Sequence, residues 1–357
     1  MRMALRAARS GLPISAREIS APIRTPIGLA VLMLASSTIP SEALAQACPT
    51  PATADNTQCT VAPGTTINVT AANGAGLSDT GSAGLITANS VTVNLNSTGA
   101  RGGWAQQGAS ILFNGSTLNA TLGALGNAAG RIGLLASGNG SSISADGATI
   151  TMGLVSTAVT NLVGVQAEGG GIVSLSGTVA MNSNANGTGI VGVRATGTGT
   201  RVSMTAGATT ATSRGALGAF AESGGTIELG DGVTVSASGA QTTGTDPRGS
   251  HALLSSGAGA LVAATGINAI TSGTLASPAR AEQGGTVRLT DSTLSATGAG
   301  SAAVFAAGAS VVSGGQMILQ GSRLSADQQY GYGLNVQGAG SSATVTNTQI
   351  TTSGNRS

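Results

Sequence analysis

The 357-residue sequence contains no lysine, and it has few charged and few aromatic side chains. Charged residues make up 8% of the chain and aromatic residues 2%, whereas globular proteins carry about 25% charged residues. Without basic clusters the chain lacks the electrostatic footprint of a nucleic-acid-binding protein, so no nucleic acid is expected as a partner. Apolar residues reach 41%, which excludes the composition of a disordered chain.

Proline is also scarce, at 9 residues, while glycine is abundant, at 57. Collagen is excluded, because the glycines have no strict three-residue period and proline is too rare. Strong helix formers other than alanine are few, which disfavours an α-rich enzyme. The composition therefore predicts an all-β protein of many short strands and turns, with a core of small aliphatic side chains.

The net charge of +2 originates in the N-terminal segment, which holds five of the fifteen arginines and two of the thirteen acids. Residues 27–35 form an apolar run after these arginines, and residues 43–45 (Ala-Leu-Ala) follow it. This is the pattern of a signal peptide, and the run is shorter than the ~20 residues that span a membrane. We expect an extended signal peptide over residues 1–45, cleaved after Ala45 or Ala47. A lipoprotein anchor at Cys48 is the alternative.

Two cysteines, Cys48 and Cys59, follow the expected cleavage site. In an oxidising compartment they indicate one disulfide that closes a short loop, with two unpaired thiols as the alternative. We assign residues 46–75 to an N-terminal cap segment with this disulfide loop. His251 is the single histidine and follows Asp-Pro-Arg-Gly-Ser, which is typical of a loop.

The rest of the chain is a repeat of about 28 residues, whose first motif is Gly, apolar, any residue, Ala, polar. Two further alternating segments follow each copy, as at 286–289 and 293–296. Three short strands per repeat predict a right-handed, three-sided parallel β-helix of about ten coils over residues 76–357. Copies of the motif begin at Gly84, Gly103, Gly133, Gly164, Gly192, Gly218, Ala252, Pro278, Ala303 and Gly333.

Parallel stacking places like residues above like, so the first motif should form ladders. Leu134, Val165 and Val193 belong to an inward ladder, and an outward position follows each of them. We expect Phe220, Leu254 and Phe305 in the outward row to be a candidate surface contact; the alternative is that folded-back loops cover them. The expected outward row is Ile86, Ala105, Leu135, Gln166, Arg194, Phe220, Leu254, Arg280, Phe305 and Asn335.

Motifs for chemistry are missing from the sequence. We find no nucleophile elbow and no calcium-binding nonapeptide, and one histidine cannot complete a metal set. We therefore expect no catalytic residues, no metal and no cofactor. Glu168, Glu222 and Glu282 share one motif position, and we expect them to be solvated corner residues; a carboxylate pair of the glycosidase type stays open.

The Arg-bearing leader, the small-residue cleavage site and the coil pattern together resemble the N-terminal passenger of a bacterial autotransporter, most closely the pertactin-like group. Residues 284–326 carry the resemblance most clearly. It implies export, surface display through an outer-membrane β-barrel, and a non-enzymatic, virulence-type adhesin that contacts a host cell-surface or matrix protein or glycan. No Arg-Gly-Asp tripeptide is present, so integrin-type adhesion is not implied.

Residues 347–357 still have the β-helix pattern, and no barrel pattern follows them. We expect a fragment, a truncated reading frame or a rod completed by a separate translocator, which would remain periplasmic without that translocator. One alternative function is a pectin-lyase-like protein that binds or cleaves polysaccharide on the same fold. Another is an ice- or surface-binding solenoid. Such a protein needs a regular Thr-x-Thr ladder, whereas the corresponding positions of this chain hold mixed residues.

Overall fold

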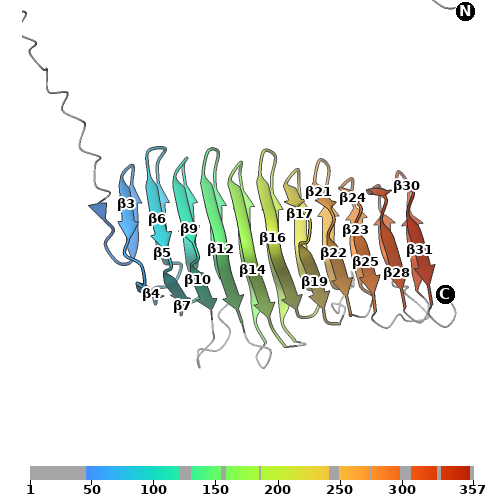
Figure 1. Cartoon of the computed structure of the whole chain (residues 1–357), viewed down its shortest axis with the longest axis horizontal. Coiled ribbons are helices and arrows are strands. Elements are labelled where there is room, and N and C mark those ends of the chain that lie inside the picture. The colour runs from blue at the N-terminus through green and yellow to red at the C-terminus, as the bar shows by residue number, and fades with distance from the viewer. Residues whose placement is uncertain are drawn as a thin grey trace, which may run out of the picture. The chain divides into compact units, whose positions relative to one another are not determined.

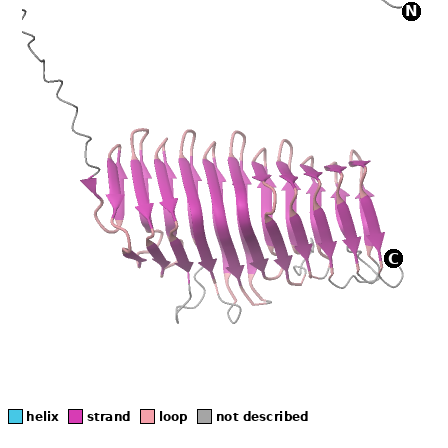
Figure 2. Cartoon of the chain, in the orientation of Figure 1, coloured by secondary structure: helices cyan, strands magenta, loops and turns pink. Residues whose placement is uncertain are grey.

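The computed structural model describes residues 46–120, 130–153, 158–184, 186–240, 249–273, 275–297, 307–327 and 331–353. Every regular element in these ranges is a β-strand (Figures 1 and 2). Residues 45–357 form one compact unit. The expected signal peptide and its cleavage site at Ala45 lie outside the described residues. A helix long and apolar enough to cross a membrane is not found in the described ranges.

The described chain winds through stacked turns that follow one another in sequence order (Figure 1). Each turn adds one strand to a first face, an 11-stranded parallel sheet. The first face consists of β2 (Ala52–Asp55), β5 (Ala75–Thr80), β8 (Arg101–Gln106), β11 (Ile132–Ser137), β13 (Thr160–Glu168), β15 (Thr188–Thr196), β17 (Leu217–Glu222), β20 (His251–Ser256), β23 (Ser277–Glu282), β26 (Ala307–Val312) and β29 (Tyr332–Gln337).

The second and third faces share one 20-stranded parallel sheet. The second face holds β1 (Gln46–Ala47), β3 (Gln58–Val61), β6 (Leu85–Asn89), β9 (Ser110–Asn114), β18 (Thr226–Leu229), β21 (Leu261–Thr265), β24 (Thr286–Thr290), β27 (Gln316–Gln320) and β30 (Ser342–Thr346). The third face holds β4 (Thr66–Val69), β7 (Thr92–Leu95), β10 (Thr117–Ala120), β19 (Thr234–Ser238), β22 (Asn268–Thr271), β25 (Thr293–Ala296), β28 (Arg323–Ala326) and β31 (Gln349–Thr352). Three long strands pass through both: β12 (Ser142–Met152), β14 (Ile172–Asn182) and β16 (Arg201–Thr212). The predicted all-β parallel β-helix of about ten coils is confirmed.

The core is a set of aliphatic ladders inside the stack. On the third face Ile67, Val93, Leu118, Ile150 and Val179 occupy one register position in five successive turns, and each is buried. Alternate residues of each strand point inward because the side-chain period of a strand is two. Burial of each such side chain contributes about 1.5–3 kcal/mol, which explains why a chain with few aromatic residues still builds a continuous core.

Pairs of adjacent glycines make the corner after the first face. Gly224 has a φ of +89°, the left-handed region that favours glycine. Its neighbour Gly225 is required for a different reason: a Cβ there would lie 2.3 Å from the carbonyl oxygen of Ala195 in the previous turn. One glycine therefore turns the chain, and the other lets successive turns come into contact.

The inward ladder of the first face is confirmed from Leu134 to Ala279, because the strands pair Leu134 with Val165 and Val165 with Val193. The repeat copy placed at Ala303 is wrong. Ser310 pairs with both Arg280 and Asn335, so Ser310 holds the outward position expected for Phe305. The correct copy begins at Gly308, which restores the leading glycine of the motif. Phe305 itself lies outside the described residues.

The first two copies are also corrected. In β5 and β8 the outward row holds Ser78 and Trp104 in place of Ile86 and Ala105. Ile86 lies on β6 and is fully buried. A one-residue slip would turn Trp104 into the narrow interior, whereas on the outside its ring lies 4.2 Å from the Arg101 guanidinium.

Residues 46–75, expected to be a cap segment, are stacked like the turns that follow. Strand β3 pairs with β6 and β4 pairs with β7. Strand β1 adds to the other edge of β3, and Cys48 is joined to Cys59 with a sulfur–sulfur distance of 2.01 Å. The disulfide therefore attaches the first described strand to the edge of the stack.

Candidate functional site

The outer surface of the first face is covered where the sequence suggested an exposed contact row. Leu254 is 0% exposed and Phe220 is 9% exposed, so neither is the free surface residue that was expected. Both belong to a second hydrophobic cluster, separate from the main core, that also contains Val163, Val191 and Leu217. The guanidinium of Arg194 lies 5.8 Å from the Phe220 ring centroid. These contacts give Phe220 a packing role.

The three glutamates of the first face do occupy one register position, with Thr196 and Ser256 between them. The expectation of solvated corner residues is wrong for Glu282, which is buried, whereas Glu168 and Glu222 are partly exposed at the ends of their strands. Glu222 forms an ion pair with Arg194, and Glu282 forms one with Arg280 at 2.7 Å.

Glu168 accepts hydrogen bonds from Ser137 at 3.0 Å and from Gln166 at 2.7 Å. With the two ion pairs, this means that each carboxylate of the register position is engaged with a neighbour on the outer face. One intervening turn separates each glutamate from the next, so their strands lie about 10 Å apart.

His251 begins strand β20 and is 1% exposed, so its prediction as a loop residue is wrong. Its Nδ1 atom lies 3.2 Å from the backbone nitrogen of Ser277, whose N–H donates to the ring. The strand begins directly after the Asp-Pro-Arg-Gly-Ser sequence, because position 251 pairs with Leu217 on one side and Ser277 on the other. The described residues contain no group of three or more metal-binding side chains.

Two charged side chains are buried in the early turns. Asp79 is 0% exposed, and its pKa is raised from 3.8 to about 6. Burial is the largest cause of the rise; the backbone hydrogen bond from Thr80 lowers the pKa, and the negative charge of Asp55 raises it further. Arg131 is 1% exposed, and burial lowers the pKa of its guanidinium. Arg131 donates from Nε to the Ser97 carbonyl oxygen at 2.8 Å, which gives it a structural role at the corner before β11.

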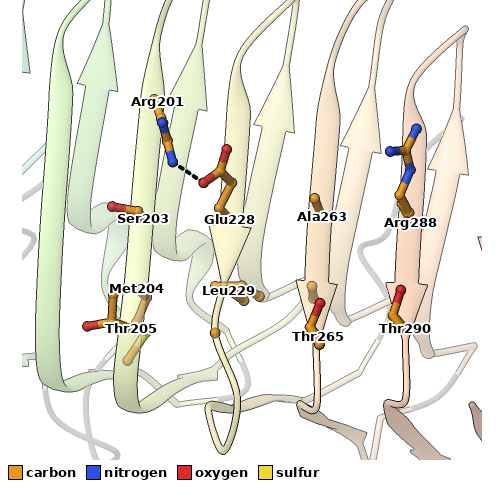
Figure 3. A pocket seen from close by; sticks show the side chains of 12 residues that line it. Arg201, Ser203, Met204, Thr205, Glu228, Leu229, Ala263, Thr265, Arg288 and Thr290 are labelled. Atoms are coloured by element: carbon orange, nitrogen blue, oxygen red, sulfur yellow. Dashed lines mark hydrogen bonds and ion pairs between the residues drawn. The ribbon is translucent and has the colours of Figure 1, made fainter. Parts of the chain in front are cut away.

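A hollow of about 440 Å³ lies on the second face across β16, β18, β21 and β24 (Figure 3). It forms where two outward positions carry almost no side chain, Ala263 and Gly230, while their neighbours are larger. Thr265 and Thr290 pair with each other along its lower side. We name this feature the β18–β24 hollow.

The β18–β24 hollow is lined by two arginines and one glutamate. Arg201 and Glu228 form an ion pair, with 50% and 41% of their side chains exposed (Figure 3). Glu228, Ala263 and Arg288 occupy one register row on successive strands, so the alanine lies between the two charged residues. Arg288 is exposed, and no ion pair or hydrogen bond joins its guanidinium to another of the described residues. The hollow therefore carries one uncompensated positive charge.

The hollow was not predicted from the sequence, although the pattern that makes it is visible in the aligned repeats. The segments 226–229, 261–265 and 286–290 align by their inward residues Ile227, Val262 and Val287. The outward residues between the inward ones are then Glu228, Ala263 and Arg288. A comparison of the outward positions on the second strand of successive repeats would therefore have found this row.

The third face carries a threonine column that the sequence analysis did not recognise. Outward positions in five successive turns hold Thr66, Thr92, Thr117, Thr149 and Thr178. The adjacent column begins with asparagines, and Asn94 donates to the side chain of Asn68 at 2.9 Å. The threonine column ends at Ala208. The position two residues along holds Asn68, Asn94, Asn119, Thr151 and Ala180 in the same turns, so no regular Thr-x-Thr ladder forms there and the positions are mixed as expected.

Comparison with protein-family models finds no match, and comparison with curated proteins finds none either. Among solved structures, the chain is similar to the crystal structure of a TibA fragment that was hyper-glycosylated by TibC. The two are 19% identical, and the match covers 84% of this chain and 98% of that one with a TM-score of 0.23. A TM-score this low does not establish a shared arrangement, so the fold and the function rest on this chain's own residues.

Proposed function

We propose that this protein is an exported, non-enzymatic β-solenoid of the autotransporter-passenger type, of the pertactin-like group, which acts as an adhesive surface. The observation that carries the proposal is the uninterrupted parallel pairing of the first face through eleven strands. Long, regular outer faces of this kind offer extended binding surface.

The architecture suits a chain that crosses a membrane unfolded. Each turn pairs only with the turns before and after it, so folding can proceed by adding one turn at a time. The Cys48–Cys59 disulfide also fits an oxidising compartment, in which such bonds persist. Together with the signal-peptide pattern of residues 1–45, these features support export to the periplasm, or to the cell surface and outer membrane where a separate translocator is present.

The proposed partner is a host cell-surface or matrix protein or a glycan. The alternative is a pectin-lyase-like role in polysaccharide binding or cleavage, and the β18–β24 hollow is the observation that favours its binding form. Cleavage would be detected as reducing-sugar release, which the proposed function does not predict.

The full chain, expressed with its leader in a Gram-negative host, tests export. We expect a mature protein that begins after Ala45 or Ala47, identified by N-terminal sequencing of the periplasmic and surface fractions. The purified mature protein, coated on a plate, should retain cultured host cells better than the same protein after heat unfolding. An uncleaved cytoplasmic product, or equal retention by the unfolded control, would overturn the proposal.

A further inference from the structure

We infer that the β18–β24 hollow binds an acidic polysaccharide, that is, a glycan that carries a carboxylate or a sulfate on its sugar rings. The inference rests on the proposed function for its biological setting, because it names the ligand class of an adhesive surface. The site itself is defined by residues of four adjacent strands and is testable on the purified chain.

The shape of the hollow follows from side-chain size on an otherwise regular sheet. Strand β16 continues from the second face into the third, whereas β18 ends at Leu229 and the chain turns away at Gly230. A Cβ at Gly230 would lie 3.2 Å from the carbonyl oxygen of Thr205, so this position stays open. With Ala263 beside it, the opening extends across four strands, or about 14 Å at the usual strand spacing. This length suits a short stretch of an extended polymer.

The charge of the hollow selects an anion. Glu228 neutralises Arg201 through their ion pair, whereas Arg288 has no acidic partner among the described side chains. A guanidinium presents paired N–H donors in a plane, which match the two oxygens of a carboxylate or of a sulfate group. The site therefore has one vacant guanidinium, about 10 Å from the Glu228 strand, in a hollow that is large enough for a ligand.

The remaining polar groups favour a sugar over a simple anion. Ser203, Thr265 and Thr290 place hydroxyl groups along the hollow, and each hydroxyl both donates and accepts. Glu228 adds carboxylate oxygens that accept from sugar hydroxyls. The two large apolar side chains that line the hollow, Met204 and Leu229, are buried, so it lacks the hydrophobic anchors that dominate protein–protein contacts. A hydroxyl-rich, negatively charged polymer satisfies all of these groups together.

The experiment measures binding of the purified mature protein to immobilised polygalacturonate, with its methyl ester as the uncharged counterpart, and to dextran sulfate, with dextran as the counterpart. We expect the charged member of at least one pair to bind and its neutral counterpart not to bind. The carboxylate and sulfate arms identify which anion the site prefers. Arg288→Gln should weaken the interaction about tenfold or more, because it removes a charge-assisted hydrogen-bonded contact.

Two further variants separate this site from general electrostatics. Arg323→Gln removes the same charge from an exposed position on β28 of the third face and should leave affinity within about twofold of the wild type. Ala263→Glu should abolish binding, because the larger side chain fills the hollow and its negative charge repels the anionic ligand. Far-UV circular dichroism of each variant checks that the stack is intact.

Three results would overturn the inference: no binding to either acidic polysaccharide, equal binding to neutral counterparts, or equal losses from Arg288→Gln and Arg323→Gln. The cell-retention assay separates this failure from failure of the proposed function. If cells are retained by the wild type and equally by Arg288→Gln, the protein is adhesive through another surface. If export and retention both fail while polygalacturonate binding persists, the site stands and the adhesive role does not.

Discussion

Asp79 should destabilise the native protein at neutral pH. This residue occupies an inward position of β5, where the turns on either side carry Ala54 and Ala105. Its carboxyl group is fully buried and lies against the backbone of Gly84, where a Cβ would come within 2.0 Å of Oδ1. Burial is the largest cause that raises the pKa of Asp79 from 3.8 to about 6. The folded chain therefore holds this proton more tightly than the unfolded chain does.

The size of the effect follows from that change in pKa. One pKa unit corresponds to about 1.36 kcal/mol, so a rise from 3.8 to about 6 lowers the free energy of unfolding by about 3 kcal/mol once the pH is well above 6. As the pH falls from 6 toward 3.8, the native carboxyl takes up its proton first and stability is regained. Below 3.8 both states are protonated and the contribution vanishes.

The variant Asp79→Ala continues the alanine ladder and removes the titrating group. The free energy of unfolding of this variant, relative to that of the wild type, should rise by up to about 3 kcal/mol from about pH 4 to pH 8. Any change in packing contributes equally at both pH values, so the pH-dependent part reports the titration of Asp79. Stacked repeats open locally, so the suitable assay is amide hydrogen exchange in β5 and β8 at both pH values, after correction for the intrinsic exchange rate. A stability difference that does not change with pH would refute the reasoning.

Asp55 supplies a control for the cause of the shift. Its charge contributes to the raised pKa of Asp79, as the last of the three influences on it. Asp55→Asn should therefore move the titration midpoint of Asp79 to lower pH while leaving the carboxyl buried. An unchanged midpoint would mean that burial and backbone contacts alone set this pKa.

Three further predictions concern packing and the edge of the stack. Gly103→Ala should strongly lower the thermal unfolding midpoint, because the added Cβ would lie 2.6 Å from the Phe113 ring. Phe113→Leu in the same chain should restore part of the lost stability, and the absence of any rescue would refute this contact. Cys48→Ser should speed amide exchange in β1 and β3 and leave β16 unchanged, since the bond closes a local loop worth about 3 kcal/mol; uniform destabilisation would contradict local opening. Phe220→Ser should lower the free energy of unfolding by about 3 kcal/mol, as for a buried aromatic, and an unaltered denaturation midpoint would show that Phe220 does not pack as described.

The sequence predicted the fold well because the signal is repeated. A two-residue alternation in one segment is weak, but the same alternation recurs at a regular distance and every copy supports the others. The inward ladder from Leu134 to Ala279 follows directly from this repetition.

The copies at Gly103 and Ala303 failed for a local reason. Each lies at consecutive small residues, Gly-Gly in the first case and Ala-Ala-Gly-Ala in the second, where more than one alignment fits the motif. There the choice depends on tertiary packing: the ring of Trp104 fits only on the outside, next to Arg101.

The candidate site was less predictable, because exposure depends on neighbours that a motif does not contain. Phe220 and Leu254 occupy an outward register, but outward is not the same as exposed when a second cluster forms on that face. His251 was misplaced because the sequence that precedes it resembles a loop. The β18–β24 hollow depends on two small residues, Gly230 just after β18 and Ala263 on β21, and their proximity exists only after the turns are stacked.

The equal register of successive turns has a consequence for how such a gene can change. Strand β20 begins at His251 and β23 begins at Ser277, and both pair with their neighbours at equivalent positions. Loss of the codons for residues 251–276 would bring β17 against β23 with every inward position still matched. Recombination between repeats can therefore shorten or lengthen the rod by whole turns, so length can vary in evolution while the cross-section is conserved.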